Sequence, residues 1–154
     1  MKIKLTLIVF IILAASCSDK PESGPVKIYY GEDICEKCKM IISEKDFAAQ
    51  YQLSNGSTLK FDDLGCMIHY MDGEETTSIS DIYVRDYSSK EWTDGNHAYY
   101  VWTESINTPM DYGIIGFQDR NLAKELSEKE NGKYLGSLQN TSDWTLQSIK
   151  QTQY

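Results

Sequence analysis

The chain has 154 residues, of which 41% are hydrophobic and 25% charged, which is the size and composition of one ordinary globular domain. It contains 15 Lys and Arg residues against 23 Asp and Glu residues, so its formal net charge is −8. Because nucleic-acid binding needs an excess of clustered cations, this balance argues against a nucleic-acid-binding protein.

The N-terminus has the pattern of a secretory signal. Lys2 and Lys4 precede a largely apolar run over residues 5–15 that is too short for a stable transmembrane helix. The small residues that follow lead to Cys17, in a sequence similar to the lipobox of bacterial lipoproteins, in which the cysteine is acylated. A plain signal peptide with an incidental cysteine is the alternative. We expect residues 1–16 to be removed and the domain to be held by lipid on Cys17 at the extracytoplasmic, periplasmic face of a bacterial membrane.

Residues 17–27 comprise the anchored cysteine and a polar, proline-containing segment that we interpret as a flexible tether. Loss of residues 1–16 removes two lysines and no acid, which leaves 13 basic and 23 acidic residues and a net charge of −10. Anionic lipid repels such a domain, so the lipid anchor is the expected membrane contact.

The predicted domain covers residues 28–132, and its first unit covers about 28–87. Two strands are expected in this unit at 47–53 and 58–61. A short helix at about 62–71 and a third strand at 82–85 follow them. Asn55-Gly56 supplies the positive φ that a tight hairpin requires. Asp62 or Asp63 is expected to cap the helix, with a catalytic acid or base as the alternative.

The second unit, at about 92–132, repeats this order with little sequence identity. Its expected elements are strands at 98–103 and 112–117 and a helix at about 119–129, which stops at Asn131-Gly132. Two such units predict an α+β fold built from repeated β-β-α units, and suggest an internal duplication. Residues 133–154 are interpreted as a C-terminal tail that either packs as a closing element or stays mobile.

Sulfur-containing side chains are concentrated in and near the first unit. Cys35, Cys38 and Met40 lie within six residues of one another, and Cys66 lies on the predicted helix. Met110 follows a proline in a predicted turn, where a methionine has little packing reason to be. Thiolates and thioethers are soft ligands that favour Cu(I), with Zn(II) as the main competitor for the thiolates.

Each of these candidates has a structural alternative. Cys35 and Cys38 would form a disulfide in an oxidising compartment. Cys66 would pack in the hydrophobic core on the buried face of its helix. His97, beside a predicted strand, is open to either interpretation. The sequence contains no catalytic triad order, phosphate loop or zinc-protease motif, so it lends little support to an enzyme.

Several segments, in the right order, resemble the NosL family. They lie between Tyr29 and Leu126, at 31–42, 46–50, 61–67, 98–101 and 108–117. NosL proteins are membrane-anchored copper lipoproteins encoded with the maturation machinery of nitrous oxide reductase. Their fold is described as two small β-β-α-β units related to the organomercurial lyase core, so the resemblance implies one further strand in each unit.

The resemblance also implies a function. A NosL protein would bind Cu(I) outside the cytoplasm and pass it toward the copper centres of nitrous oxide reductase, through a partner transporter complex or directly. It would be a metallochaperone and not an enzyme.

A ligand set follows from the motifs of the family. Its Cys-x-x-Cys-Gly-Met motif falls on Cys35, Cys38 and Met40, with Lys39 where glycine is usual. Its Thr-Pro-Met motif ends at Met110 and is followed by Asp111 where glycine is common. We therefore expect Cys35 or Cys38 as the principal thiolate and Met40 and Met110 as thioether ligands. Cys66 and His97 are further candidates to complete the site.

Three other functions remain open. The Cys35 and Cys38 pair also suits a thiol-disulfide oxidoreductase, although such motifs usually begin a helix after a strand in a βαβ context. Organomercurial cleavage is suggested by fold analogy alone. A general copper chaperone or sensor would be favoured if the gene lay apart from those of nitrous oxide reductase.

Overall fold

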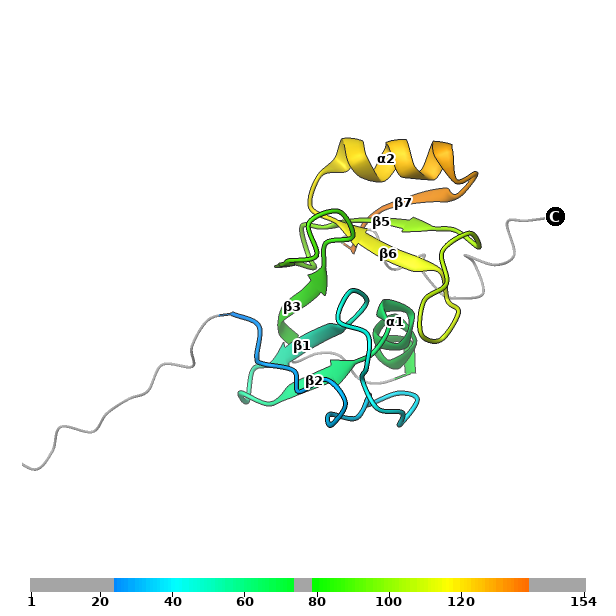
Figure 1. Ribbon diagram of the computed structural model, residues 1–154. Helices are drawn as coiled ribbons and strands as arrows, with labels where there is room; N and C mark the ends of the chain where they lie inside the picture. Colours follow the sequence, from blue (N-terminus) through cyan, green and yellow to red (C-terminus); the bar gives the residue numbers. More distant parts are fainter. Residues whose placement is uncertain (1–23, 74–78, 139–154) are drawn as a thin grey trace, which may run out of the picture.

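Two small antiparallel sheets, each with one helix, make up the computed structural model, which describes residues 24–73 and 79–138. The first sheet and its helix comprise β1 (Ala49–Leu53), β2 (Thr58–Phe61), α1 (Leu64–Gly73), β3 (Ile79–Arg85) and β4 (Trp92–Asp94). The second group comprises β5 (Tyr99–Trp102), β6 (Ile114–Phe117), α2 (Arg120–Lys129) and β7 (Lys133–Ser137). Figure 1 shows the two groups one above the other, with α2 at one end of the molecule. The predicted α+β class is confirmed.

Both sheets place the first strand of their unit between the second and the third. The strand order is β2-β1-β3-β4 in the first sheet and β6-β5-β7 in the second. All of these pairings are antiparallel, and β4 extends the edge of the first sheet. In each unit a strand follows the helix, β3 in the first unit and β7 in the second.

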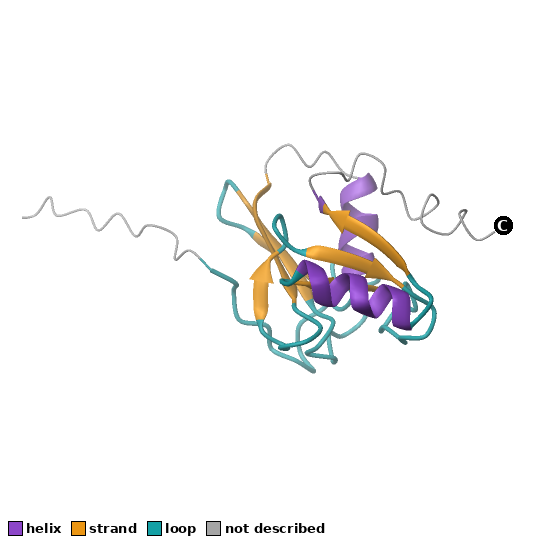
Figure 2. Cartoon of the chain, turned by 90° about the horizontal axis from the view of Figure 1, so that it is seen from above, coloured by secondary structure: helices purple, strands orange, loops and turns teal. Residues whose placement is uncertain are grey.

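The two helices have different surroundings. α2 packs on the three strands of its own sheet, whereas α1 contacts β1 and β2 of the first sheet and also β6 of the second. Figure 2, seen from above, shows the two helices in different parts of the molecule. Because α1 lies between the units, a side chain on its buried face can meet residues from both.

The connection between β1 and β2 forms as its sequence predicts. Gly56 has a φ of +86°, and the N–H of Ser57 donates to Asn55 Oδ1 at 2.9 Å. The turn sets the register in which Ala49 lies opposite Phe61, the last residue of β2. Phe61 is fully buried, and the chain that leaves it runs directly into the start of α1.

The second unit extends beyond the boundary expected at residue 132. β7 pairs with β5 along Lys133–Ser137, so part of the segment interpreted as a tail is the third strand of the second sheet. β7 has few apolar residues and includes Gly136, so its own pattern is weak, and it is recognisable as a strand only through its pairing with β5. Residues 139–154 of the predicted tail lie outside the described residues.

The two sheets meet at Asp86 and Gly116, which form an isolated parallel bridge. The N–H of Tyr87 donates to the carbonyl of Gly116 at 2.8 Å. A Cβ on Gly116 would come within 3.1 Å of Val84 Cγ2, so the absence of a side chain lets β6 approach β3 closely. This contact joins the two units into one structure.

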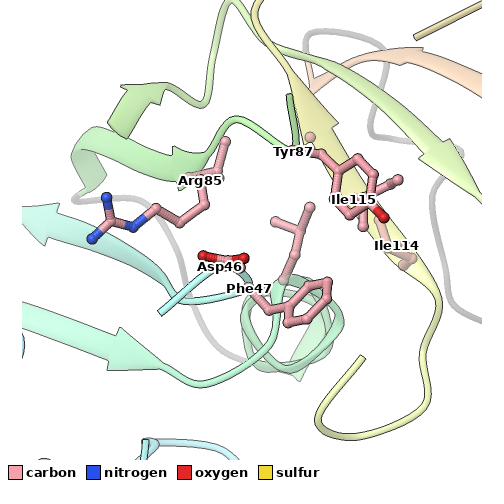
Figure 3. A pocket seen from close by; sticks show the side chains of 9 residues that line it. Asp46, Phe47, Arg85, Tyr87, Ile114 and Ile115 are labelled. Atoms are coloured by element: carbon pink, nitrogen blue, oxygen red, sulfur yellow. The ribbon is translucent and has the colours of Figure 1, made fainter. Parts of the chain in front are cut away.

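A small cavity of about 10 Å³ lies beside this contact, which is room for about one water molecule. Figure 3 shows that its lining includes Asp46, Phe47 and Arg85. Buried Arg85 stacks on Trp92 at 4.0 Å, and its Nε has no hydrogen-bond partner in the described part of the chain. No cysteine, histidine or methionine lines this cavity, so it is separate from the sulfur-rich residues.

Membrane attachment through a spanning helix finds no support in residues 24–73 and 79–138. None of the helices there has the length and apolar character needed to cross a bilayer.

Candidate metal centre

The Cys-x-x-Cys motif forms a closed loop before β1. Ile34 and Ile41 pair as an isolated antiparallel bridge at the base of the loop. Inside it, the N–H of Cys35 donates to the carbonyl of Met40 at 2.8 Å, and the N–H of Lys39 donates to the carbonyl of Cys35 at 3.0 Å. Because neighbouring side chains in an extended segment point to opposite sides, Cys35 is fully buried while Ile34 is 55% exposed.

The start of α1 supplies a third cysteine. Asp63 Oδ1 accepts the N–H of Gly65 at 2.6 Å and so caps the helix, as the sequence predicted. Its other oxygen accepts the N–H of Met110 at 3.1 Å, which ties the Thr-Pro-Met turn to the start of the helix. Cys66, on the first turn, is fully buried. One carboxylate therefore positions both the helix and the turn.

Gly65 allows this close packing. A Cβ at Gly65 would lie 2.3 Å from Tyr112 Cβ, closer than two carbon atoms can approach. The turn that carries Met110 and Tyr112 can therefore rest on the helix beside Cys66 only because residue 65 has no side chain.

Four side chains converge between the loop and the helix: Cys35, Cys38, Asp62 and Cys66. One ligand atom from each lies within 4.8 Å of every other, so the group could hold a metal ion. Cys35, Asp62 and Cys66 are buried, whereas Cys38 is half-buried. The three cysteines are free thiols in this structure. Three thiols and a carboxylate form a donor set for a thiophilic metal, with Cys38 on the solvent side.

The three thiols do not ionise alike. The thiol of Cys66 donates to the sulfur of Cys35, and this hydrogen bond lowers the pKa of Cys35 while it raises that of Cys66. Burial raises the pKa of Cys38. Cys35 is therefore the first of the three to become a thiolate, the form that binds metal.

Asp62 is a weaker acid in the group than it is in water. Burial, followed by the hydrogen bond and the charge at Cys35, raises the pKa of its carboxyl to about 6. Sequence reasoning considered Asp62 as a helix cap or as a catalytic acid or base, and therefore missed it as a candidate ligand. One feature of the sequence could have indicated this role: Asp62 lies four residues before Cys66 and directly after the buried last residue of a strand.

The remaining predicted ligands differ in their surroundings. Met40 is 55% exposed, and its backbone N–H bonds to Cys38 while its side chain faces solvent. Met110 is half-buried and packs against the core that contains Cys35 and Cys66. His97 does not join the group, because its ring bonds to Asp94 Oδ2 at 2.8 Å and its side chain is 76% exposed. Cys17, the expected lipid site, lies outside the described residues.

The two departures from the NosL motifs have a common structural feature. Lys39 has a φ of 62° and Asp111 a φ of 57°, so both adopt the left-handed conformation that glycine adopts without strain. The positions at which the family pattern has glycine are therefore positions where this backbone bends in the same way.

Comparison with known proteins agrees with these features. A family model described as NosL matches residues 25–144. The crystal structure of the copper chaperone NosL from Shewanella denitrificans is similar, with a TM-score of 0.62 and 18% identity. The match covers 71% of this chain and 90% of that one, and it shows a shared fold. No curated protein matches the chain significantly. Since the family model spans well over half of the sequence, the chain belongs to the NosL family.

Proposed function

We propose that this protein is a lipid-anchored, extracytoplasmic carrier of Cu(I) that supplies copper for the assembly of nitrous oxide reductase. The observation that carries the proposal is the convergence of Cys35, Cys38, Cys66 and Asp62 in a member of the NosL family. The similar protein from Shewanella denitrificans is named a copper chaperone. In this interpretation copper is the cargo of the protein.

The donor chemistry supports Cu(I). Thiolates are soft ligands, and two of the three cysteines here are fully buried, which keeps water away from a bound ion. Cys35 ionises first, so it provides the principal thiolate. Zn(II) remains the competitor, since Asp62 adds an oxygen ligand that a borderline metal accepts.

The uneven exposure of the ligands supports transfer to a partner. Cys38 is the half-buried member of the group, and the exposed thioether of Met40 lies two residues away in the same loop. An incoming ligand can therefore replace Cys38 before it meets buried Cys35 or Cys66. We propose the nitrous oxide reductase maturation transporter complex, or the reductase itself, as the partner.

The anchor is proposed from the N-terminal sequence. The apolar run that ends at Cys17 has the pattern of a lipoprotein signal, and lipid on this cysteine would hold the domain at the outer face of a membrane. We propose no catalytic role for the protein.

Thiol redox chemistry fits the geometry less well. A reactive cysteine of that kind is partly exposed at the N-terminus of a helix. Here Cys35, the first cysteine of the motif, is fully buried, and both motif cysteines lie in a loop that no helix follows. Copper binding therefore accounts better for the site.

The decisive experiment is an anaerobic titration of residues 18–154 with Cu(I) in competition with a chromophoric chelator. We expect tight binding of about one copper per chain, lost when Cys35→Ser and Cys38→Ser are combined. His97→Gln is the matched control, because His97 lies outside the group, and it should bind as the unsubstituted protein does. Binding that survives the double substitution would contradict the site. No binding, together with a readily reduced disulfide, would favour redox chemistry.

A further inference from the structure

Exposed large apolar side chains are concentrated in one segment of the protein. Among the described residues, five of the six such side chains belong to residues 26–41, and the sixth is Leu122 on α2. The five are Val26, Tyr29, Ile34, Met40 and Ile41. Figure 1 shows this segment, in blue and cyan, along the edge of the molecule away from α2. Single exposed apolar residues are ordinary, but such a grouping marks an interaction surface. We call these five side chains the 26–41 surface.

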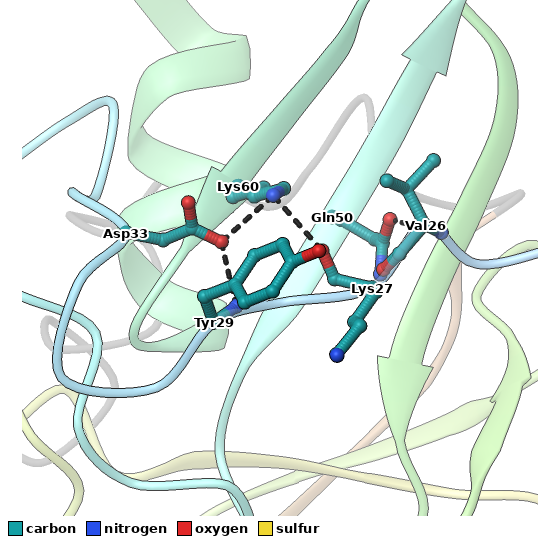
Figure 4. A network of polar contacts seen from close by, with 6 residues as sticks. All are labelled: Val26, Lys27, Tyr29, Asp33, Gln50 and Lys60. Atoms are coloured by element: carbon teal, nitrogen blue, oxygen red, sulfur yellow. Dashed lines mark hydrogen bonds and ion pairs between the residues drawn. The ribbon is translucent and has the colours of Figure 1, made fainter.

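The first part of this segment is fixed to the sheet. The buried side chain of Gln50 accepts the N–H of Val26 and donates to its carbonyl, both at 2.9 Å, as Figure 4 shows. Lys60 Nζ donates to the carbonyl of Lys27 at 3.0 Å and pairs with Asp33 at 2.7 Å. Val26 and Tyr29 are therefore presented by a backbone that is held in place.

The second part presents its apolar residues in the same way. The N–H of Gly31 donates to the carbonyl of Ile42 at 2.9 Å, next to the bridge between Ile34 and Ile41. Ile42 and Cys35 are fully buried, so the residues adjacent to them, Ile34 and Ile41, are directed outward, and each is 55% exposed. The backbone pairing within the loop therefore holds Ile34 and Ile41 in their exposed positions.

The charge of the segment differs from that of the rest of the chain. Residues 26–41 contain three lysines and three acidic residues, so they are neutral in a chain of net charge −8. Lys27 Nζ lies 4.5 Å from the centre of the Tyr29 ring, and Lys60 lies 5.9 Å from it. Aromatic rings bordered by lysines are typical of protein surfaces at the headgroup level of a membrane.

The surface is also close to the proposed anchor along the chain. Val26 comes nine positions after Cys17, and this length of chain reaches at most about 30 Å. This is roughly the diameter of a domain of about 110 residues. A lipid on Cys17 would therefore keep the whole domain, and Val26 at the end of the tether first of all, at a high local concentration of lipid.

We propose that the 26–41 surface rests on the phospholipid headgroups of the membrane that holds the anchor. This inference rests on the lipid on Cys17 that is proposed above, and it adds a second membrane contact to it. The neutral charge of the segment removes the repulsion that the acidic remainder of the domain meets at anionic lipid.

Tryptophan fluorescence in vesicles tests this orientation. The lipidated mature protein is incorporated into vesicles of phosphatidylethanolamine and phosphatidylglycerol, with or without lipids brominated near the top of the acyl chains. Tyr29→Trp and Ile41→Trp report on the surface. Leu122→Trp, at another exposed apolar position, is the matched control. The signal of the native tryptophans is subtracted, and mass spectrometry of the Cys17 peptide establishes the lipid.

With lipid on Cys17, we expect brominated lipid to quench the tryptophans at positions 29 and 41 at least twice as strongly as the one at position 122. Equal quenching at the three positions, or none at 29 and 41, would overturn the membrane contact while leaving the anchor intact. A Cys17 peptide without lipid would refute the anchor, and the orientation would fall with it. Unchanged thermal unfolding of the three variants verifies that each is folded.

Discussion

Both carboxylate oxygens of Asp62 lie 3.6 Å from the Sγ of Cys38. Asp62 follows β2 and Cys38 lies in the loop before β1, so the contact joins residues 24 positions apart. It brings a carboxylate to the one cysteine of the group that is not fully buried. The contact therefore links the carboxylate to the cysteine that an incoming ligand meets first.

Asp62→Asn tests whether this contact contributes to metal binding. The amide has nearly the same shape but carries no charge, so a metal would lose an anionic ligand or a charged hydrogen-bond acceptor. We expect Cu(I) affinity to fall by about tenfold, in the range typical of residues that support metal ligands. Chelator competition measures the change. Equal affinity in the variant would limit Asp62 to a role in folding.

Cys66→Ser tests the third thiol. Cys66 is fully buried and hydrogen-bonded to Cys35, so its loss removes a ligand and also the bond that lowers the pKa of Cys35. We expect Cu(I) affinity to fall more than it does in Asp62→Asn. Met71→Leu, on the same helix, is the control and should retain full affinity. Circular dichroism verifies folding, and unchanged binding by the serine variant would remove Cys66 from the site.

Met110→Leu tests the thioether of the Thr-Pro-Met turn. The backbone N–H of Met110 bonds to Asp63, and leucine retains that bond and most of the apolar volume. We expect weaker Cu(I) binding with a free energy of unfolding that changes by less than about 1.5 kcal/mol. Chelator competition and urea unfolding measure the two quantities. Unchanged affinity would show that Met110 only packs against the core.

Acidity should change the contribution of Asp62 to the stability of the metal-free protein in a defined direction. The pKa of Asp62 is about 6 in the folded chain against an ordinary value of 3.8, so the folded state binds this proton more tightly. Its contribution to the free energy of unfolding is complete below about pH 3.8 and is lost as the pH rises through 6. Burial raises the pKa of Asp63 as well, in the same direction.

The comparison that isolates this effect is urea unfolding of the reduced, metal-free protein and of Asp62→Asn at pH 7.5 and pH 5. We expect the unsubstituted protein to gain about 1 kcal/mol relative to the variant on acidification. Parallel pH dependence of the two proteins would show that Asp62 does not titrate in this range.

Lys39→Gly should stabilise the fold. Lys39 is in the left-handed region at φ 62°, where a Cβ is strained, and its ion pair with Glu36 is exposed. Glycine relieves the strain, but it loses the ion pair and gains freedom in the unfolded chain. Because the relief is the largest of these effects, we expect the free energy of unfolding to rise by roughly 0.5–1 kcal/mol. Lys39→Ala is the control, because it loses the ion pair and keeps the Cβ. Denaturant unfolding that ranks alanine above glycine would contradict the argument.

Local sequence signals determined much of the fold. Asn55-Gly56 specifies the hairpin, and Asp119 accepts the N–H groups of Asn121 and Leu122 at the start of α2. These signals act between residues a few positions apart, so they are visible in the sequence. β7 has no such signal, because its strand conformation depends on pairing with β5, some 30 residues away.

The sequence by itself identified Cys35 and Cys38 as a candidate site, through their spacing and their resemblance to the NosL pattern, and named Cys66 and His97 as further candidates. Only the tertiary structure decided that Cys66 and Asp62 lie beside this pair and that His97 does not. It also decided which thiol faces solvent. The physical reason is that a metal group is assembled by packing between segments distant in the chain, and burial and hydrogen bonding across such contacts leave no periodic trace in the sequence.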